Sequence, residues 1–106
     1  MTSDGVEFVR VAAVGEVPEG RGTVVSVDQV HIALFNVAGT IRAIGNTCPH
    51  RGGSLASGEL RGCEAVCPLH DWRFDLATGQ STTHRAAKVV TYPVRVEGGA
   101  IYIGLG

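Results

Sequence analysis

The chain has 106 residues, 44% of them hydrophobic and 18% charged, which excludes a disordered segment and predicts one globular domain spanning residues 1–106. Nine basic and ten acidic residues give a formal charge of −1, which argues against the strongly basic face of a nucleic-acid-binding protein. The N-terminus lacks the basic and apolar regions of a signal peptide, and no apolar run approaches the roughly 18 residues of a membrane helix, so we expect a cytoplasmic protein that binds neither nucleic acid nor a membrane.

Valine-rich stretches separated by turn residues predict β-strands in the first half of the chain. Residues 6–13 alternate in polarity, which is typical of a strand. Residues 23–28 and 30–37 are rich in β-branched and aromatic side chains, and we expect them to pair as a hairpin. The dipeptide at 38–39 then turns the chain into a further strand over 40–44.

The middle of the chain, from about residue 45 to residue 80, contains loops and short strands rather than long regular elements. The short strands are expected at residues 59–60, 64–66 and 72–76. Loops of this kind carry function when a rigid scaffold positions them.

The C-terminal segments 88–97 and 100–104 flank Gly98 and Gly99, which predicts another hairpin. Pro93 lies inside the first of these segments and is expected at a sheet edge or a bulge, because proline has no backbone N–H to donate. The expected fold is all-β, with antiparallel sheets forming a base domain and the loop-rich part inserted into it.

Three cysteines occur in the chain, at positions 48, 63 and 67. An odd number without an export signal argues against a disulfide framework. Two of the three belong to matching short motifs, CPH at 48–50 and CPLH at 67–70, which are separated by sixteen residues. Each motif supplies one thiolate and one imidazole, so the two loops together offer two sulfurs and two nitrogens to a metal centre.

Two kinds of metal centre take two cysteines and two histidines. A single zinc ion accepts this set, although zinc fingers usually place the cysteines in one half and the histidines in the other. A two-iron cluster suits a mixed pair in each loop better, because each loop can then contribute one ligand to each iron.

The motifs and their surroundings resemble the Rieske [2Fe–2S] family over essentially the whole chain. "NTCPHRGGSLASGEL" resembles the first cluster-binding loop of that family, and "AVCPLHDWRFDLATGQ" resembles the second. The resemblance implies a Rieske fold and one [2Fe–2S] cluster per chain. It further implies that Cys48 and Cys67 bind the inner, buried iron, and that His50 and His70 bind the outer iron near the surface.

The function that the resemblance implies is one-electron transfer by a monomeric Rieske ferredoxin, which is not itself an enzyme. Its partners would be a NAD(P)H-dependent flavin reductase that acts as ferredoxin reductase, and a terminal oxygenase. A fixed small subunit bound to the large subunit of an NADH-dependent nitrite reductase is the alternative, because "CPLHDW" and "TYPVRVEGG" resemble that subunit too. Many such subunits lack the four ligands, which this chain keeps. A structural zinc module is a further alternative.

The chain departs from the respiratory type of Rieske protein at several positions. The cysteines that form a disulfide between the two cluster loops in those proteins would fall at Gly53 and Leu69, so that bridge is absent. Trp72 replaces a serine that donates a hydrogen bond to the cluster. Both changes resemble the ferredoxin type and predict a low reduction potential. A covering loop that often contains proline corresponds here to "STTHRAAK" at 81–88, which has none.

Several other residues have an ordinary structural interpretation. Cys63 fits no ligand position and is expected to be an unpaired thiol, and His31 to be a structural or surface histidine. His84 is expected to be a solvated loop residue, although it lies where it could approach the cluster. Trp72 is expected in the core beneath the second loop, with a docking surface as the alternative.

The residues beside the ligands are candidates for contact with a partner. Arg51, Leu69 and Asp71 adjoin His50 or His70. Asp71 also occupies a position that is often glycine in similar proteins. Gly52 and Gly53 are expected to let the first loop turn close to the cluster.

Overall fold

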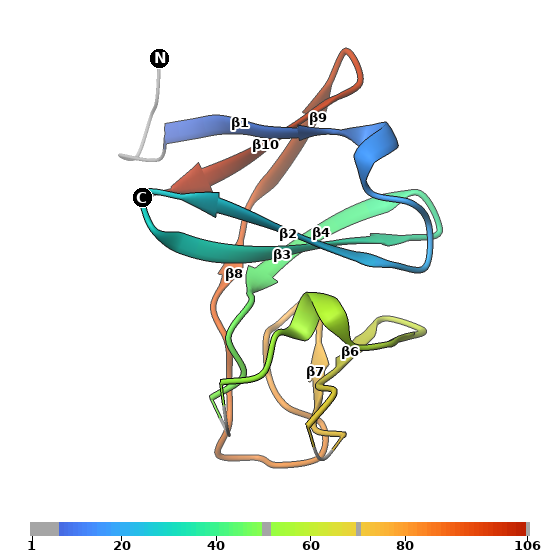
Figure 1. The fold of residues 1–106 in the computed structure, drawn as a ribbon, viewed down its shortest axis with the longest axis vertical. Coiled ribbons are helices and arrows are strands. Elements are labelled where there is room, and N and C mark those ends of the chain that lie inside the picture. Colours follow the sequence, from blue (N-terminus) through green and yellow to red (C-terminus); the bar gives the residue numbers. More distant parts are fainter. Residues whose placement is uncertain (1–6, 50–51, 70, 106) are drawn as a thin grey trace.

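The computed structural model describes residues 7–49, 52–69 and 71–105, and strands dominate this part of the chain (Figure 1). The strands are β1 (Glu7–Ala13), β2 (Gly22–Val27), β3 (Val30–Val37), β4 (Thr40–Gly45), β5 (Leu60–Arg61), β6 (Glu64–Val66), β7 (Arg73–Asp75), β8 (Thr91–Tyr92), β9 (Val94–Glu97) and β10 (Ala100–Leu105). Two short 3-10 helices are η1 (Val14–Glu16) and η2 (Leu55–Ser57). The all-β expectation is confirmed.

The described residues form three antiparallel sheets. The base consists of a three-stranded sheet in the order β1-β10-β9 and a four-stranded sheet in the order β2-β3-β4-β8. The third sheet, β5-β6-β7, is small and belongs to the loop-rich part. In Figure 1 the base occupies the upper half of the molecule, and the loop-rich part lies below it.

Strand β3 is buried on both faces, because successive side chains of a strand point to opposite sides. On one face Ile32 and Leu34 pack with Ile101 of β10, which joins the two base sheets. On the other face Phe35 packs with Leu55 of the loop-rich part. The nearly continuous apolar run over 30–37 therefore reflects a central strand between two cores.

Two-residue turns with positive φ connect β2 to β3, β3 to β4 and β9 to β10, which is typical of type I′ hairpins. The φ angles are 50° and 68° at Asp28 and Gln29, 51° and 93° at Ala38 and Gly39, and 58° and 80° at Gly98 and Gly99. The predicted hairpins and the turns at 38–39 and 98–99 are thus confirmed.

The segment predicted as one strand over 88–97 is divided in the structure. Its residues form β8, which pairs with β4, and β9, which pairs with β10 in the other base sheet. Pro93 stands between the two strands, at the point where the chain passes from one sheet to the other. Its carbonyl still accepts a hydrogen bond from Gly104 N–H at 2.9 Å, while no N–H is required of it. Because β8 and β9 are each the edge strand of their sheet, Pro93 lies at a sheet edge, as expected, and not at a bulge inside one strand.

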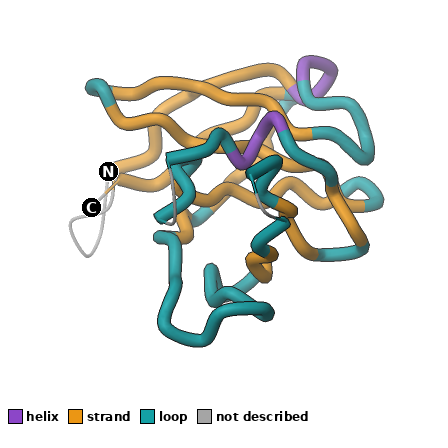
Figure 2. Tube along the Cα trace, turned by 60° about the horizontal axis from the view of Figure 1, so that its bottom comes forward, coloured by secondary structure: helices purple, strands orange, loops and turns teal. Residues whose placement is uncertain are grey.

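The loop-rich part is held directly against the base. A Cβ atom on Gly22 of β2 would lie only 2.7 Å from the Ala56 carbonyl oxygen. The helix η2 therefore packs so closely against this strand that a side chain at position 22 would clash with it. The tube in Figure 2 shows that this part consists mostly of loops, drawn in teal, beside the strands of the base. The core of the loop-rich part also includes Ala87 and Val89, so it contains side chains beyond residue 80.

None of the helices among residues 7–49, 52–69 and 71–105 has the length and apolar character needed to cross a membrane.

Candidate metal centre

The first ligand loop follows β4 and is closed by its own backbone. Cys48 N–H donates to the Gly53 carbonyl at 2.9 Å, and Gly52 N–H donates to the Cys48 carbonyl at 2.8 Å. Gly52 has a φ of 74°, a conformation that glycine adopts without strain. The tight turn expected at Gly52 and Gly53 is therefore present.

A buried asparagine holds this loop on the base. Asn46 is 8% exposed, and its N–H donates to the His31 carbonyl of β3 at 3.0 Å. Its side-chain amide donates to Ser54 Oγ at 3.0 Å, and its side-chain oxygen accepts from Ala56 N–H at 2.8 Å. Asn46 was not among the expected site residues. The sequence does contain a signal for this role. Asn46 stands at the end of a strand, two residues before a predicted ligand, and asparagine side chains at such positions often bond to nearby backbone.

The second ligand loop connects β6 to β7. Cys67 directly follows β6, and its N–H donates to the Trp72 carbonyl at 2.7 Å, which closes this loop as well. Asp71 adopts a φ of 57°, which explains why glycine suits this position. Asp71 is exposed, and Leu69 is 42% exposed, so both side chains are accessible, and their contact with a partner stays a prediction.

The two loops bring Cys48 and Cys67 together in the interior. The two side chains are 1% and 0% exposed, belong to the same core cluster and form no disulfide. Burial raises the pKa of the Cys67 thiol, the Leu69 backbone hydrogen bond lowers it, and Cys48 and Asp71 raise it. Because metals bind thiolates, loading this site must release protons.

Gly53 lies between the two loops at their closest approach. A Cβ atom at this position would lie 3.0 Å from Cys67 Sγ and 3.2 Å from Leu69 Cδ1. Gly53 and Leu69 are thus neighbours in space, at the positions where the respiratory type carries its disulfide. Here close packing of Leu69 on a glycine joins the loops instead.

The predicted ligands His50 and His70 lie outside the described residues, as does Arg51. The structure therefore brings together the two predicted sulfur ligands and leaves the two predicted nitrogen ligands as a prediction. No group of three or more histidine, cysteine, aspartate or glutamate side chains arranged to hold a metal occurs among the residues that are described.

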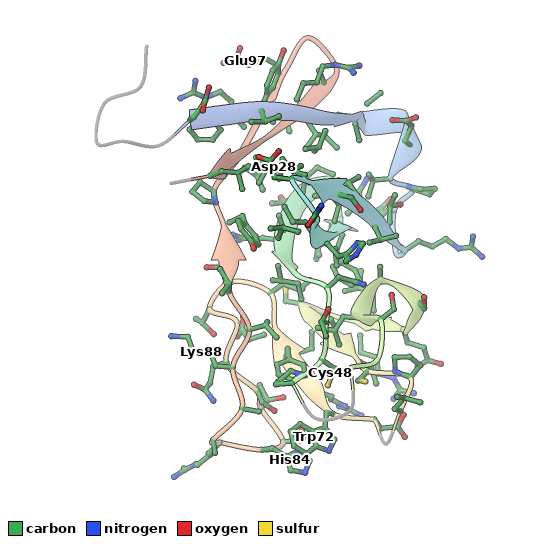
Figure 3. All side chains as sticks on the ribbon, turned by 60° about the vertical axis from the view of Figure 1, so that its left-hand side comes forward. Asp28, Cys48, Trp72, His84, Lys88 and Glu97 are labelled. Atoms are coloured by element: carbon green, nitrogen blue, oxygen red, sulfur yellow. The ribbon has the colours of Figure 1, made fainter. Side chains whose placement is uncertain are left out.

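A third loop, residues 81–88, packs against the second ligand loop. The rings of Trp72 and His84 stack with their centroids 3.6 Å apart and an interplanar angle of 10°. Figure 3 shows Cys48 lying above this pair, with Trp72 and His84 at the lower end of the molecule. Trp72 also packs on the core, as expected, whereas His84 is exposed but held by the stack rather than only solvated.

Hydrogen bonds shape the third loop in place of the absent proline. Ser81 is 3% exposed, and its Oγ accepts from the N–H of His84 at 3.0 Å. Thr83 Oγ1 accepts from Arg73 N–H at 3.1 Å and joins the loop to β7. The Gln80 side-chain amide donates to the Arg85 carbonyl at 2.8 Å.

Two residues outside the ligand loops have the structural roles expected of them. Cys63 is an exposed free thiol, and His31 is an exposed histidine bonded to Ser26 Oγ at 3.0 Å.

A family model described as the Rieske [2Fe-2S] domain matches residues 7–93 of the chain. This chain belongs to the Rieske family. Its similarity to the ferredoxin component of the naphthalene 1,2-dioxygenase system of Pseudomonas aeruginosa amounts to 37% identity over 100 residues, which cover 93% of this chain and 96% of that protein.

Solved Rieske structures have the same fold. The ferredoxin of Sphingomonas yanoikuyae B1 matches with a TM-score of 0.85 at 29% identity, over 94% of this chain and all 100% of that one. A protein described as an NADH-dependent nitrite reductase small subunit, from Mycobacterium tuberculosis, matches with a TM-score of 0.87 at 27% identity, over 97% and 98% of the two chains. The Rieske chain described here carries one [2Fe–2S] cluster and is an electron carrier, not an enzyme.

The described residues fit this cluster. Two buried thiols in contact offer the soft sulfur ligands that iron–sulfur clusters take. The Leu69 backbone hydrogen bond to the Cys67 sulfur is of the kind that tunes such clusters. The Rieske assignment thus agrees with the geometry of the two ligand loops.

Asp71→Gly is expected to raise the free energy of unfolding by about 1 kcal/mol, because glycine adopts a φ of 57° without the cost of a side chain. Asp71→Ala removes the same carboxylate but keeps a Cβ atom, so it should not share this gain. Thermal unfolding of the three holoproteins at equal cluster content measures the difference. Equal stability of the glycine and alanine variants would contradict the explanation.

Proposed function

We propose that this Rieske chain is a ferredoxin that passes single electrons from a NAD(P)H-dependent flavin reductase to a terminal oxygenase. The observation that carries the proposal is the 37% identity to a dioxygenase ferredoxin component over nearly the whole of both chains. The cluster, when bound, takes up and releases one electron. The protein holds it between two loops at one end of a rigid base.

The proposed ligands are Cys48 and Cys67 for the inner iron and His50 and His70 for the outer iron. Burial of both thiols, in contact with each other, supports their assignment to one iron. His50 and His70 follow the two cysteines by two and three residues in the same loops.

Reconstitution tests the proposed function. The purified holoprotein is mixed with the flavin reductase and the terminal oxygenase of an aromatic-ring dioxygenase system from its source. Substrate-dependent NADH consumption is expected only when this chain is present, and the cluster-free variant Cys48→Ser serves as the control. Turnover that does not depend on the chain would overturn the proposal.

A small subunit of a nitrite reductase is the second candidate, supported by the TM-score of 0.87 to the Mycobacterium tuberculosis protein. The two candidates differ in how the chain is held by its partner. A carrier dissociates readily and purifies alone, whereas a subunit co-purifies with a large protein that reduces nitrite. Native purification at moderate salt distinguishes them.

Further expectations belong to the same proposal. We place the carrier in the cytoplasm, as a monomer, and treat residues 1–106 as one Rieske domain whose cluster-binding part spans about residues 45–80. Size-exclusion chromatography of the holoprotein tests the monomer.

A low reduction potential is expected for the holoprotein, near the lower end of the Rieske span of about −150 to +300 mV. Leu69 faces Gly53 where the respiratory type has a disulfide, and Trp72 replaces the hydroxyl that donates to the cluster. Direct electrochemistry measures the midpoint. A value close to +300 mV would show that these two positions do not control the potential.

A further inference from the structure

An apolar hollow lies at the end of the molecule beside both ligand loops. Its volume is about 470 Å³, and apolar atoms make up most of its lining. The lining residues are Pro49, Trp72, His84, Arg85, Ala86 and Ala87. Pro49 directly follows Cys48, and Trp72 follows Asp71 in the second loop, so this surface adjoins the cluster site from two sides.

The hollow has a preformed shape. The Trp72–His84 stack forms one wall, and the hydrogen bonds of Ser81 and Thr83 fix the loop that carries His84. Gln80 donates from its side-chain amide to the carbonyls of Arg85 and Ala87 at 2.8 and 3.0 Å. A surface that is already ordered loses little conformational entropy when a partner binds.

Arg85 lines the hollow, and Lys88 directly follows the lining residue Ala87 in the sequence. Arg85 and Lys88 are exposed, and within residues 7–49, 52–69 and 71–105 neither has an ion-pair partner. The whole chain carries a formal charge of −1, so this positive border differs from the average of the molecule.

We propose that Trp72, His84, Arg85 and Lys88 form a docking face for an electron-transfer protein whose contact surface is apolar at its centre and rimmed with carboxylates. The proposal rests on the proposed carrier function and names the chemistry of its partner. Aromatic residues and arginine are enriched at protein interfaces, and complementary charge mainly raises the association rate. A second copy of this chain would bring the same positive border against itself and does not fit.

Small charged one-electron oxidants can measure the electrostatic potential of this face, and they do not require the natural partner. Ferricyanide is an anion, and tris(1,10-phenanthroline)cobalt(III) is a cation; each accepts one electron from the reduced cluster, and its metal goes from the +3 to the +2 state. The rates are measured by stopped flow with the reduced holoprotein at low and high salt. The double variant Arg85→Glu/Lys88→Glu is expected to slow ferricyanide about tenfold at low salt and to speed the cobalt complex.

Arg10→Glu provides the control, because Arg10 is exposed on β1, at the end of the molecule opposite the hollow. Its change of charge equals that of Arg85→Glu alone, which is measured beside it, and is half that of the double variant. Arg10→Glu is expected to alter either rate less than twofold, and the effect of the double variant should vanish at high salt. Iron and sulfide contents and the midpoint potential of each variant are measured alongside. The proposal is overturned if Arg10→Glu matches the double variant, or if neither changes the rates.

Two further outcomes are informative. A dimer in size-exclusion chromatography that Arg85→Glu/Lys88→Glu dissociates would replace the carboxylate-rimmed partner with a second copy and overturn the proposal. Unchanged oxidant rates together with normal turnover in the reconstituted oxygenase system would reject this docking face and leave the carrier function intact. Rates that depend on the border charges, with no turnover in that system, would reject the carrier function alone.

Discussion

Replacing Cys48 or Cys67 by serine is expected to yield a protein that retains almost no iron or acid-labile sulfide. Both thiols are buried and in contact, and a hydroxyl is a poor substitute for the thiolate that iron–sulfur clusters require. The unaltered protein should contain two irons and two sulfides per chain, as a [2Fe–2S] protein does. Colorimetric iron and sulfide assays, with the visible absorption spectrum, measure the loss.

Cys63→Ser is the matched control for these two variants. Its thiol is exposed and lies in the turn between β5 and β6, so the cluster should remain at full occupancy. Full occupancy in Cys48→Ser would refute the assignment of that ligand. One zinc and no sulfide in the unaltered protein would refute the cluster itself.

Gly58→Ala is expected to lower the free energy of unfolding by about 3 kcal/mol or more. A Cβ atom on Gly58 would lie 1.8 Å from the Val66 carbonyl oxygen, which is backbone and cannot turn aside. Each kcal/mol corresponds to about 4–8 °C in Tm for a domain of this size, so the melting temperature should fall by more than about 10 °C. Because Val66 directly precedes Cys67, cluster content should fall too.

Gly15→Ala introduces the same methyl group into open space, at a position with no unfavourable φ. Its stability is expected to change by less than about 1 kcal/mol. Thermal unfolding of both variants at equal protein concentration compares them. A Gly58→Ala protein as stable as Gly15→Ala would mean that the β6 backbone gives way easily at Val66.

The elements that depend on local pattern were predictable from the sequence. Alternating and β-branched runs indicated β1 to β4, and the dipeptides at 38–39 and 98–99 indicated turns that the structure contains. The spacing of CPH and CPLH indicated two matching ligand loops, and their two cysteines indeed meet in the interior. These features follow from the sequence because turn formation and strand propensity are properties of a few adjacent residues.

Only the tertiary structure decided which distant segments touch. The Trp72–His84 stack joins residues twelve positions apart, and Gly58 is required by the carbonyl of Val66 on another segment. The division of 88–97 at Pro93 also depends on two sheets, each of which takes one half. Such contacts arise from close packing among all the elements at once, and packing leaves no signature in the residues of any single segment.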